Sequence, residues 1–282
     1  MSIRTDLAIE LSGEEKEDIS GVEKEYKEEG DIKATVVKIT SRQGERATGK
    51  PIGKYITLEF PPIYKISDYS SLKKAVAGSL DSLLEGKRES ILIAGLGNTD
   101  ITPDSIGPLT AKQILATRHI SGQFADSIGL KGLRSVSVIA PGVLGQTGIE
   151  TTELIKGAVE AVKPDAVIVI DALAAMSAER LFRTVQLCNT GISPGSGVKN
   201  SRREISEKTL GVPVIAVGVP TVTDADALAF ELTGKEPEKS CDMFVTPKDV
   251  DLLADRISEI LALSLNRFLQ PEIDEEIISE LV

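Results

Sequence analysis

Two aspartates stand where strand-like apolar runs end. Asp104 lies in the turn GLGNTDITPDSIGP at 95–108, which directly follows the apolar run 91–94. Asp171 lies near the end of a second run, AVIVIDAL at 166–173. If the two strands are neighbours in a parallel sheet, both carboxylates reach the same sheet edge. Two close carboxylates do not readily both ionise, so one retains a proton near neutral pH. One could act as general base on a water and the other as general acid, which would allow peptide hydrolysis.

Other chemistries fit these residues less well. Gly95 and Gly97 resemble part of a dinucleotide-binding turn, but Asp100 stands where the third glycine belongs. His119 is the single histidine, no GxSxG motif is present, and we expect it at the surface or at a helix end. The usual zinc ligands are lacking, although carboxylates alone could hold a hard cation, so we predict neither a cofactor nor a metal. A structural alternative is that each of the two aspartates only caps a helix.

Composition sets the class of protein. The chain has 282 residues, 41% of them hydrophobic, which is enough for one large core or two small ones. The net charge of −11 disfavours direct binding to nucleic acid. No apolar run is long enough for a membrane span, and no signal peptide opens the chain. The cysteines, Cys188 and Cys241, form no CxxC pair, so we expect a cytoplasmic protein with reduced thiols.

The order of elements predicts an α/β fold. Strand-like runs at 90–97, 134–142, 166–173 and 212–220 come with helix-like segments at 67–86, 105–118, 149–162 and 248–269. This order favours a mainly parallel sheet flanked by helices on both faces. The runs 32–40 and 55–60, separated by a long loop at 41–54, suggest a small additional β unit at 32–60.

Two further segments are polar. Residues 10–31 are dense in Glu and Lys, which is typical of a mobile, solvated arm. Segment 189–202 reads as a long Gly/Ser loop, and loops of this kind are often functional. Its Gly191, Gly195 and Gly197 would allow an extended substrate to approach the backbone closely. We therefore place this loop beside the two aspartates.

Five motifs together resemble the germination protease family of endospore-forming bacteria. In chain order they are GLGNTDITPDSIGP, APGVLGQTGIET, VIDALAA, NTGISPGSGVKN and VGVPTVTDADAL. The resemblance implies an endopeptidase that degrades small acid-soluble spore proteins during germination, in the cytoplasm of the forespore and spore core. It also implies a homotetrameric zymogen that is activated by loss of a propeptide. The family's two essential aspartates fall on Asp104 and Asp171, and Asn98 in the same turn is a predicted substrate-binding residue.

The family in turn resembles the hydrogenase maturation peptidases, which bind nickel through two acidic residues and a histidine. No equivalent histidine is evident here, so a metal-dependent maturation-type peptidase, or a non-enzymatic relative on the same fold, is the alternative. The resemblance also leads us to expect an arginine shortly after DALA. Met176 stands near that position, with Arg180 further along.

The string TDLAIE at 5–10 is similar to the site at which the family cuts its substrates, after the acidic residue. The resemblance therefore implies that the chain is cut between Asp6 and Leu7. Residues 1–6 would be a propeptide, 7–31 a charged segment, and 32–282 a single α/β peptidase domain. An ordinary disordered start is the alternative for this stretch.

Overall fold

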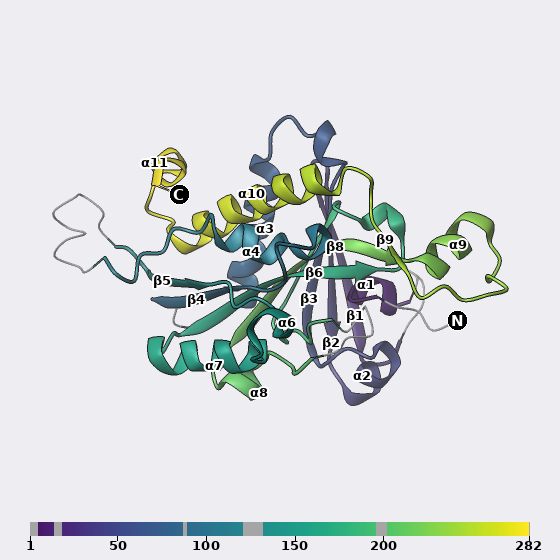
Figure 1. The fold of residues 1–282 in the computed structure, drawn as a ribbon, viewed down its shortest axis with the longest axis horizontal. Coiled ribbons are helices and arrows are strands. Elements are labelled where there is room, and N and C mark those ends of the chain that lie inside the picture. The colour runs from purple at the N-terminus through teal and green to yellow at the C-terminus, as the bar shows by residue number, and fades with distance from the viewer. Residues whose placement is uncertain (1–4, 14–18, 87–88, 121–131, 196–201, 282) are drawn as a thin grey trace.

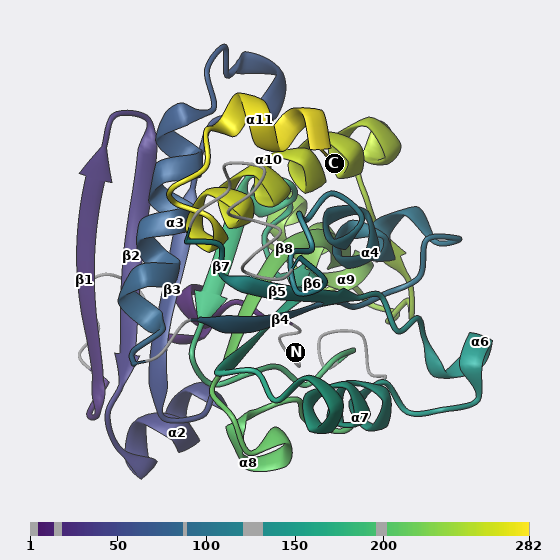
Figure 2. The same cartoon turned by 90° about the vertical axis from the view of Figure 1, so that its left-hand side faces the viewer.

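The computed structural model describes residues 5–13, 19–86, 89–120, 132–195 and 202–281. Within these ranges the strands form one nine-stranded sheet in the order β1-β2-β3-β7-β8-β6-β4-β5, with β9 paired to β8 (Figures 1 and 2). The strands are β1 (Val22–Glu29), β2 (Ile32–Ile39), β3 (Gly53–Glu59), β4 (Ser90–Gly95), β5 (Ser135–Ile139), β6 (Ala166–Ala175), β7 (Thr184–Cys188), β8 (Val214–Asp224) and β9 (Phe244–Val245).

The sheet is mixed, so the prediction of a mainly parallel sheet is wrong. Among the described strands, only the pairs β5–β4, β4–β6 and β6–β8 are parallel. The pairs β1–β2, β2–β3, β3–β7, β7–β8 and β8–β9 are antiparallel. The β unit at 32–60 was expected beside the main body, but β3 pairs with β7 and so continues the same sheet. Strand β7 was not predicted, because its five residues lie just before the Gly/Ser loop and give no clear alternation.

Helices cover both faces of the sheet, as expected. They are α1 (Ala8–Leu11), α2 (Arg42–Thr48), α3 (Ser70–Leu83), α4 (Ile106–Ala111), α6 (Leu144–Thr147), α7 (Thr151–Val162), α8 (Glu207–Leu210), α9 (Ala225–Thr233), α10 (Val250–Leu269) and α11 (Glu275–Leu281), with short 3-10 turns η1 (Ile63–Lys65), η2 (Thr102–Asp104) and η3 (Ala178–Arg180). Figure 1 shows α3, α4 and α10 on one face and α7 and α8 on the other.

Alternation along the central strands divides the core between these faces. On β4, Ile91 and Ile93 join the cluster under α3, α4 and α10, whereas Leu92 joins the cluster under α7. Successive strand side chains point to opposite faces, so a strand with apolar residues at every position serves both clusters. This explains why the central strands read as continuous apolar runs.

Local structure differs from expectation in three segments. The predicted loop 41–54 contains α2, because Ser41 caps its first turn by accepting a hydrogen bond from the Gly44 amide at 3.2 Å. The predicted arm 10–31 contains β1, which pairs with β2 along its whole length. The helix predicted at 105–118 ends at Ala111.

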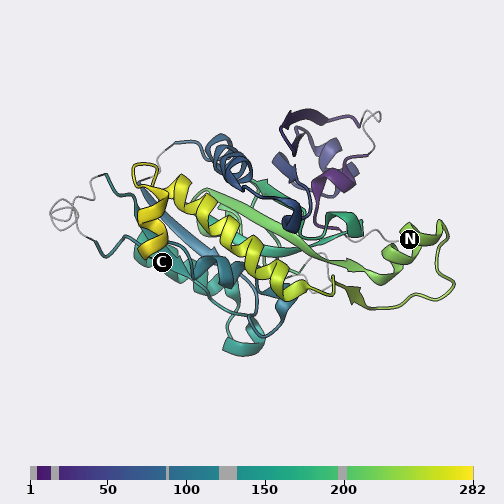
Figure 3. The same ribbon diagram turned by 90° about the horizontal axis from the view of Figure 1, so that it is seen from above.

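At one end of the molecule, α9 and the chain leading to β9 extend beyond the sheet, and α10 lies lengthwise over the central strands (Figure 3). In the described part of the chain, no helix is both long and apolar enough to cross a membrane.

Candidate active site

The turn after β4 fixes Asp104 through its main chain. Gly97 has a φ of +116°, and a Cβ on it would lie 2.0 Å from the carbonyl oxygen of Asp104. That same oxygen accepts a hydrogen bond from the Asn98 amide at 3.0 Å, and the Asp104 amide donates to the Ile101 carbonyl at 2.7 Å. Only glycine combines this backbone conformation with so close an approach. The turn therefore places the carboxylate of Asp104 without using the side chain itself.

Asp171 lies on the adjoining strand, as the sequence predicts for a shared edge. Strands β4 and β6 are parallel neighbours in which Gly95 is opposite Ile170. The Leu96 amide, one residue beyond β4, donates to the Ile170 carbonyl at 2.8 Å. Asp171 sits inside β6, which continues to Ala175, so the alternative that it caps a helix is wrong.

The two aspartates line one cavity of about 400 Å³. Residues from distant parts of the chain line it with them, among them Asp6, Gly195 and Arg202. The cavity thus joins the edge of the parallel strands to the start of the chain and to the loop after β7. Its size suits a few residues of an extended peptide.

Both carboxylates are shifted toward the protonated form. Burial raises the pKa of Asp104, while the Asn98 amide and the positive charge of Arg202 act in the opposite direction. Asp171 is only 5% exposed, and its pKa is raised well above the usual 3.8, first by burial and then by the charges of Asp104 and Asp6. A hydrogen bond from the Ala172 amide at 3.0 Å opposes that shift. Such a pair can hold one shared proton near neutral pH.

The predicted loop lies beside this site as far as it is described. Gly195 lines the cavity with the aspartates. Gly191 has a φ of +79° and lines an adjoining cavity of about 270 Å³. Gly197 lies outside the described residues. The Asn98 side chain has partners within the protein: its Oδ1 accepts from the Asp100 amide at 2.9 Å and from Gln146 Nε2 at 2.8 Å. His119 is exposed, as expected.

The start of the described chain is docked on β6, so the alternative of a disordered start is wrong for residues 5–13. The Asp6 amide donates to the Ala174 carbonyl at 2.9 Å, and the Ala174 amide donates back to Asp6 Oδ2 at 2.9 Å. Leu7 is fully buried. The bond between Asp6 and Leu7 therefore lies at the edge of the cavity, between two residues that the fold holds in place.

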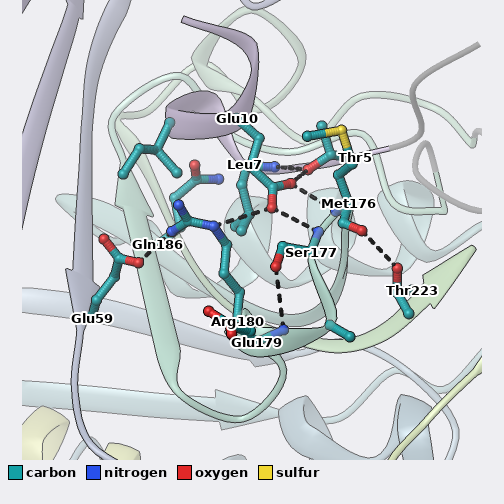
Figure 4. Close-up of polar contacts among 12 residues, drawn as sticks. Thr5, Leu7, Glu10, Glu59, Met176, Ser177, Glu179, Arg180, Gln186 and Thr223 are labelled. Atoms are coloured by element: carbon teal, nitrogen blue, oxygen red, sulfur yellow. Dashed lines mark hydrogen bonds and ion pairs between the residues drawn. The ribbon is translucent and has the colours of Figure 1, made fainter. Parts of the chain in front are cut away.

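Arg180 and Gln186 also belong to this region, and no sequence pattern pointed to Gln186. Gln186 lies on β7, and its side-chain amide contacts the main chain at Asp6 and Ala8. Arg180 does not approach the aspartate pair but binds Glu10 and Glu59 (Figure 4). The sequence pointed to Arg180 only as the arginine further along from DALA, and its partner Glu10 is the last residue of TDLAIE.

Among the residues that the structure describes, no group of three or more His, Cys, Asp and Glu side chains is arranged to hold a metal ion. In the same ranges, both cysteines are free thiols, Cys188 buried and Cys241 exposed.

Comparison with known proteins gives concordant matches. A family model described as germination protease matches residues 4–232. The germination protease of Clostridium tetani is 44% identical, with 98% of each chain covered. That of Caldanaerobacter subterraneus subsp. tengcongensis is 43% identical and covers 100% of this chain and 98% of its own. Among solved structures, the NiFe hydrogenase maturation protease HycI from Thermococcus kodakarensis is similar with a TM-score of 0.38 and 18% identity, over 66% of this chain and 98% of that one.

The family model spans most of the chain, and the two relatives are similar to it along nearly its full length. The chain is therefore a peptidase and belongs to the germination protease family.

Proposed function

We propose that this peptidase initiates the degradation of small acid-soluble spore proteins during germination, with Asp104 and Asp171 as its acid/base pair. The observation that carries the proposal is the convergence of both aspartates on one cavity whose edge also holds Asp6. Membership of the family supports the biological role. We propose that the enzyme acts in the cytoplasm of the forespore and spore core, and that it assembles as a homotetramer.

The environments of the two carboxylates suggest how the roles divide. Asp171 is the more buried and has acidic neighbours, so it is the better proton holder. The Asn98 amide and the positive charge of Arg202 both lower the pKa of Asp104 against the effect of burial, so it is the better base. In this scheme Asp104 takes a proton from a water as the water oxygen bonds to the peptide carbonyl carbon. Asp171 then gives its proton to the leaving amine nitrogen as the C–N bond breaks.

The same site is proposed to process its own chain between Asp6 and Leu7. Residues 1–6 would then be a propeptide, followed by a charged segment at 7–31 and a single domain at 32–282. Supporting this, Asp6 lines the cavity with the pair, and its charge contributes to the raised pKa of Asp171. Because the cleavage site already lies at the candidate active site, a change in the protonation of the carboxylates or a small local rearrangement would be enough for the chain to be cut.

The loop glycines Gly191, Gly195 and Gly197 are proposed to admit the extended substrate backbone, and Asn98 to bind substrate from the turn. No metal or cofactor is part of the scheme, because the two carboxylates supply both proton transfers.

The test is to incubate the purified protein with a small acid-soluble spore protein and to locate each cut by mass spectrometry. Cuts after acidic residues that persist in excess chelator support the proposal. Activity that a chelator abolishes and one particular divalent ion restores would favour the metal-dependent maturation-type alternative. Absence of any cut in a folded, processed sample would overturn the proposed substrate.

A further inference from the structure

Residues 5–10 are held along the end of β6 in the manner of a bound peptide. Asp6 exchanges two hydrogen bonds with Ala174, one of them through its side chain. The Gln186 side chain donates from Nε2 to the Asp6 carbonyl at 3.0 Å and accepts from the Ala8 amide at 2.6 Å. One side chain thus holds the main chain on both sides of Leu7. Most of these contacts use backbone groups, so they would hold peptides of many sequences.

Glu10 makes the contacts that depend on sequence. Its Oε2 accepts from the Met176 amide at 2.7 Å and from the Thr5 hydroxyl, and its Oε1 accepts from the Ser177 amide at 3.1 Å. The Nε of Arg180 lies 3.2 Å from the same Oε1. The Glu10 side chain is only 2% exposed, and Figure 4 shows these donors converging on its carboxylate.

Arg180 brings a positive charge to this position. Backbone amides bind neutral and charged oxygens alike, but a guanidinium beside a buried site favours a carboxylate. The other end of Arg180 is fixed, because its Nη1 lies 2.5 Å from Glu59 Oε1. Arg180 therefore meets its ligand in a preset orientation, and a neutral side chain in the place of Glu10 would leave part of this donor set without a charged partner.

We infer that Arg180, with the amides of Met176 and Ser177, forms a specificity-determining subsite for an acidic side chain four positions beyond the cleaved bond. In the unprocessed chain Glu10 occupies this subsite. In the processed enzyme Glu10 lies close to the new N-terminus at Leu7, and a substrate carboxylate displaces it. The inference rests on the proposed cleavage between Asp6 and Leu7, since that bond sets the count of four. Arg180 is a binding residue here and takes no part in proton transfer.

A cycle of two enzymes and two peptides tests the subsite. The peptides copy residues 1–13 of this chain, one with the natural sequence and one carrying Glu10→Gln. The wild-type protein should cut the natural peptide with a kcat/KM about 10- to 100-fold higher than that for the Glu10→Gln peptide, chiefly through a lower KM. The reason is that the Glu10→Gln peptide cannot form the charge-assisted hydrogen bond with Arg180. Arg180→Gln should cut the two peptides at nearly equal efficiency. Arg256→Gln removes an exposed arginine on α10 and should retain the wild-type preference.

The outcomes separate this inference from the proposed function. A merely structural role for Arg180 would lower the rate for both peptides by the same factor and leave the preference unchanged, which overturns the subsite. Equal cutting of both peptides by the wild-type protein overturns it too, while the proposed peptidase role stands. If the wild-type protein cuts neither peptide after Asp6, the proposed cleavage site and the subsite fail together. If Arg180→Gln does not fold, the test uses Arg180→Lys instead, and the preference of this variant between the two peptides is compared with that of the wild-type protein.

Discussion

Asp171 and Glu10 are both buried carboxylates beside the end of β6, but their surroundings differ in charge. The carboxylate of Glu10 meets a guanidinium, two backbone amides and a hydroxyl. Asp171 meets the single amide of Ala172 and two acidic neighbours, Asp104 and Asp6, which raise its pKa further than burial alone. A carboxylate that is fully provided with donors binds, whereas one that is crowded by like charge holds and releases protons. The same functional group thus suits recognition in one place and proton transfer in the other.

The largest effect should come from removing either proton carrier. Asp104→Asn and Asp171→Asn keep the size of the side chain and most hydrogen bonds but cannot transfer the proton. Each should lower kcat by roughly 10²- to 10⁴-fold while the circular dichroism spectrum stays unchanged. Self-processing should fail with it. A folded variant that cuts at near wild-type rate would remove that aspartate from the proposed pair.

A smaller effect is expected where the carboxylate only binds. Glu10→Ala leaves the amides of Met176 and Ser177 without their acceptor. Their hydrogen exchange should speed up about 10- to 100-fold, because charge-assisted hydrogen bonds of this kind contribute roughly 1.5–3 kcal/mol. Glu259→Ala, at an exposed ion pair on α10, should leave both amides unchanged. Unchanged exchange in Glu10→Ala would mean that the segment is not docked as described.

Self-processing should depend on pH in the direction set by the raised pKa values. The charges of Asp104 and Asp6 both repel a charge on Asp171, and in the proposed scheme the aspartate pair needs one proton to work. The rate should therefore rise several-fold as pH falls from about 7.5 to about 5.5, and fall again when the second carboxylate is protonated. Sequencing the new N-terminus at each pH measures this. A rate that increases toward alkaline pH, or a terminus other than Leu7, contradicts the scheme.

The smallest effect should appear in stability. Because its pKa is raised above the usual 3.8, the folded chain binds a proton at Asp171 more tightly than the unfolded chain does. That contribution to stability is complete below the usual value and is lost as pH rises through the folded pKa. Asp171→Asn should accordingly unfold at a higher temperature than the wild-type protein at about pH 7.5, with the difference shrinking toward about pH 4. Thermal unfolding followed by circular dichroism checks it, and a difference that grows toward acid pH would reverse the assigned sign.

The sequence predicted the strands that carry the pair and the edge where it lies. The apolar runs before Asp104 and through Asp171 mark buried strands, and buried parallel strands bring their ends together. The same reasoning missed the direction of β3 and β7, because strand pairing across many residues depends on tertiary packing. It also missed β1, whose charged residues resemble a solvated arm and become a strand only by pairing with β2.

The docked segment was predictable only in part. TDLAIE suggested a cleavage site, but no local pattern reports that Gln186 would hold its main chain or that Arg180 would hold Glu10. Both residues come from chain positions far from the segment that they bind. Single-sequence patterns report local periodicity and caps, whereas these contacts depend on the three-dimensional fold.

Strand β1 affects how copies of this protein associate with one another. Among the strands that the structure describes, it stands first in the order and so forms one outer edge of the sheet. Exposed edges of this kind template aggregation unless charge interrupts them. The sequence VEKEYKEE carries Glu or Lys at six of its eight positions. Two copies of β1 laid together would set many of these charges against one another, so growth of the sheet from molecule to molecule is disfavoured, even at the high protein concentration of a crowded compartment.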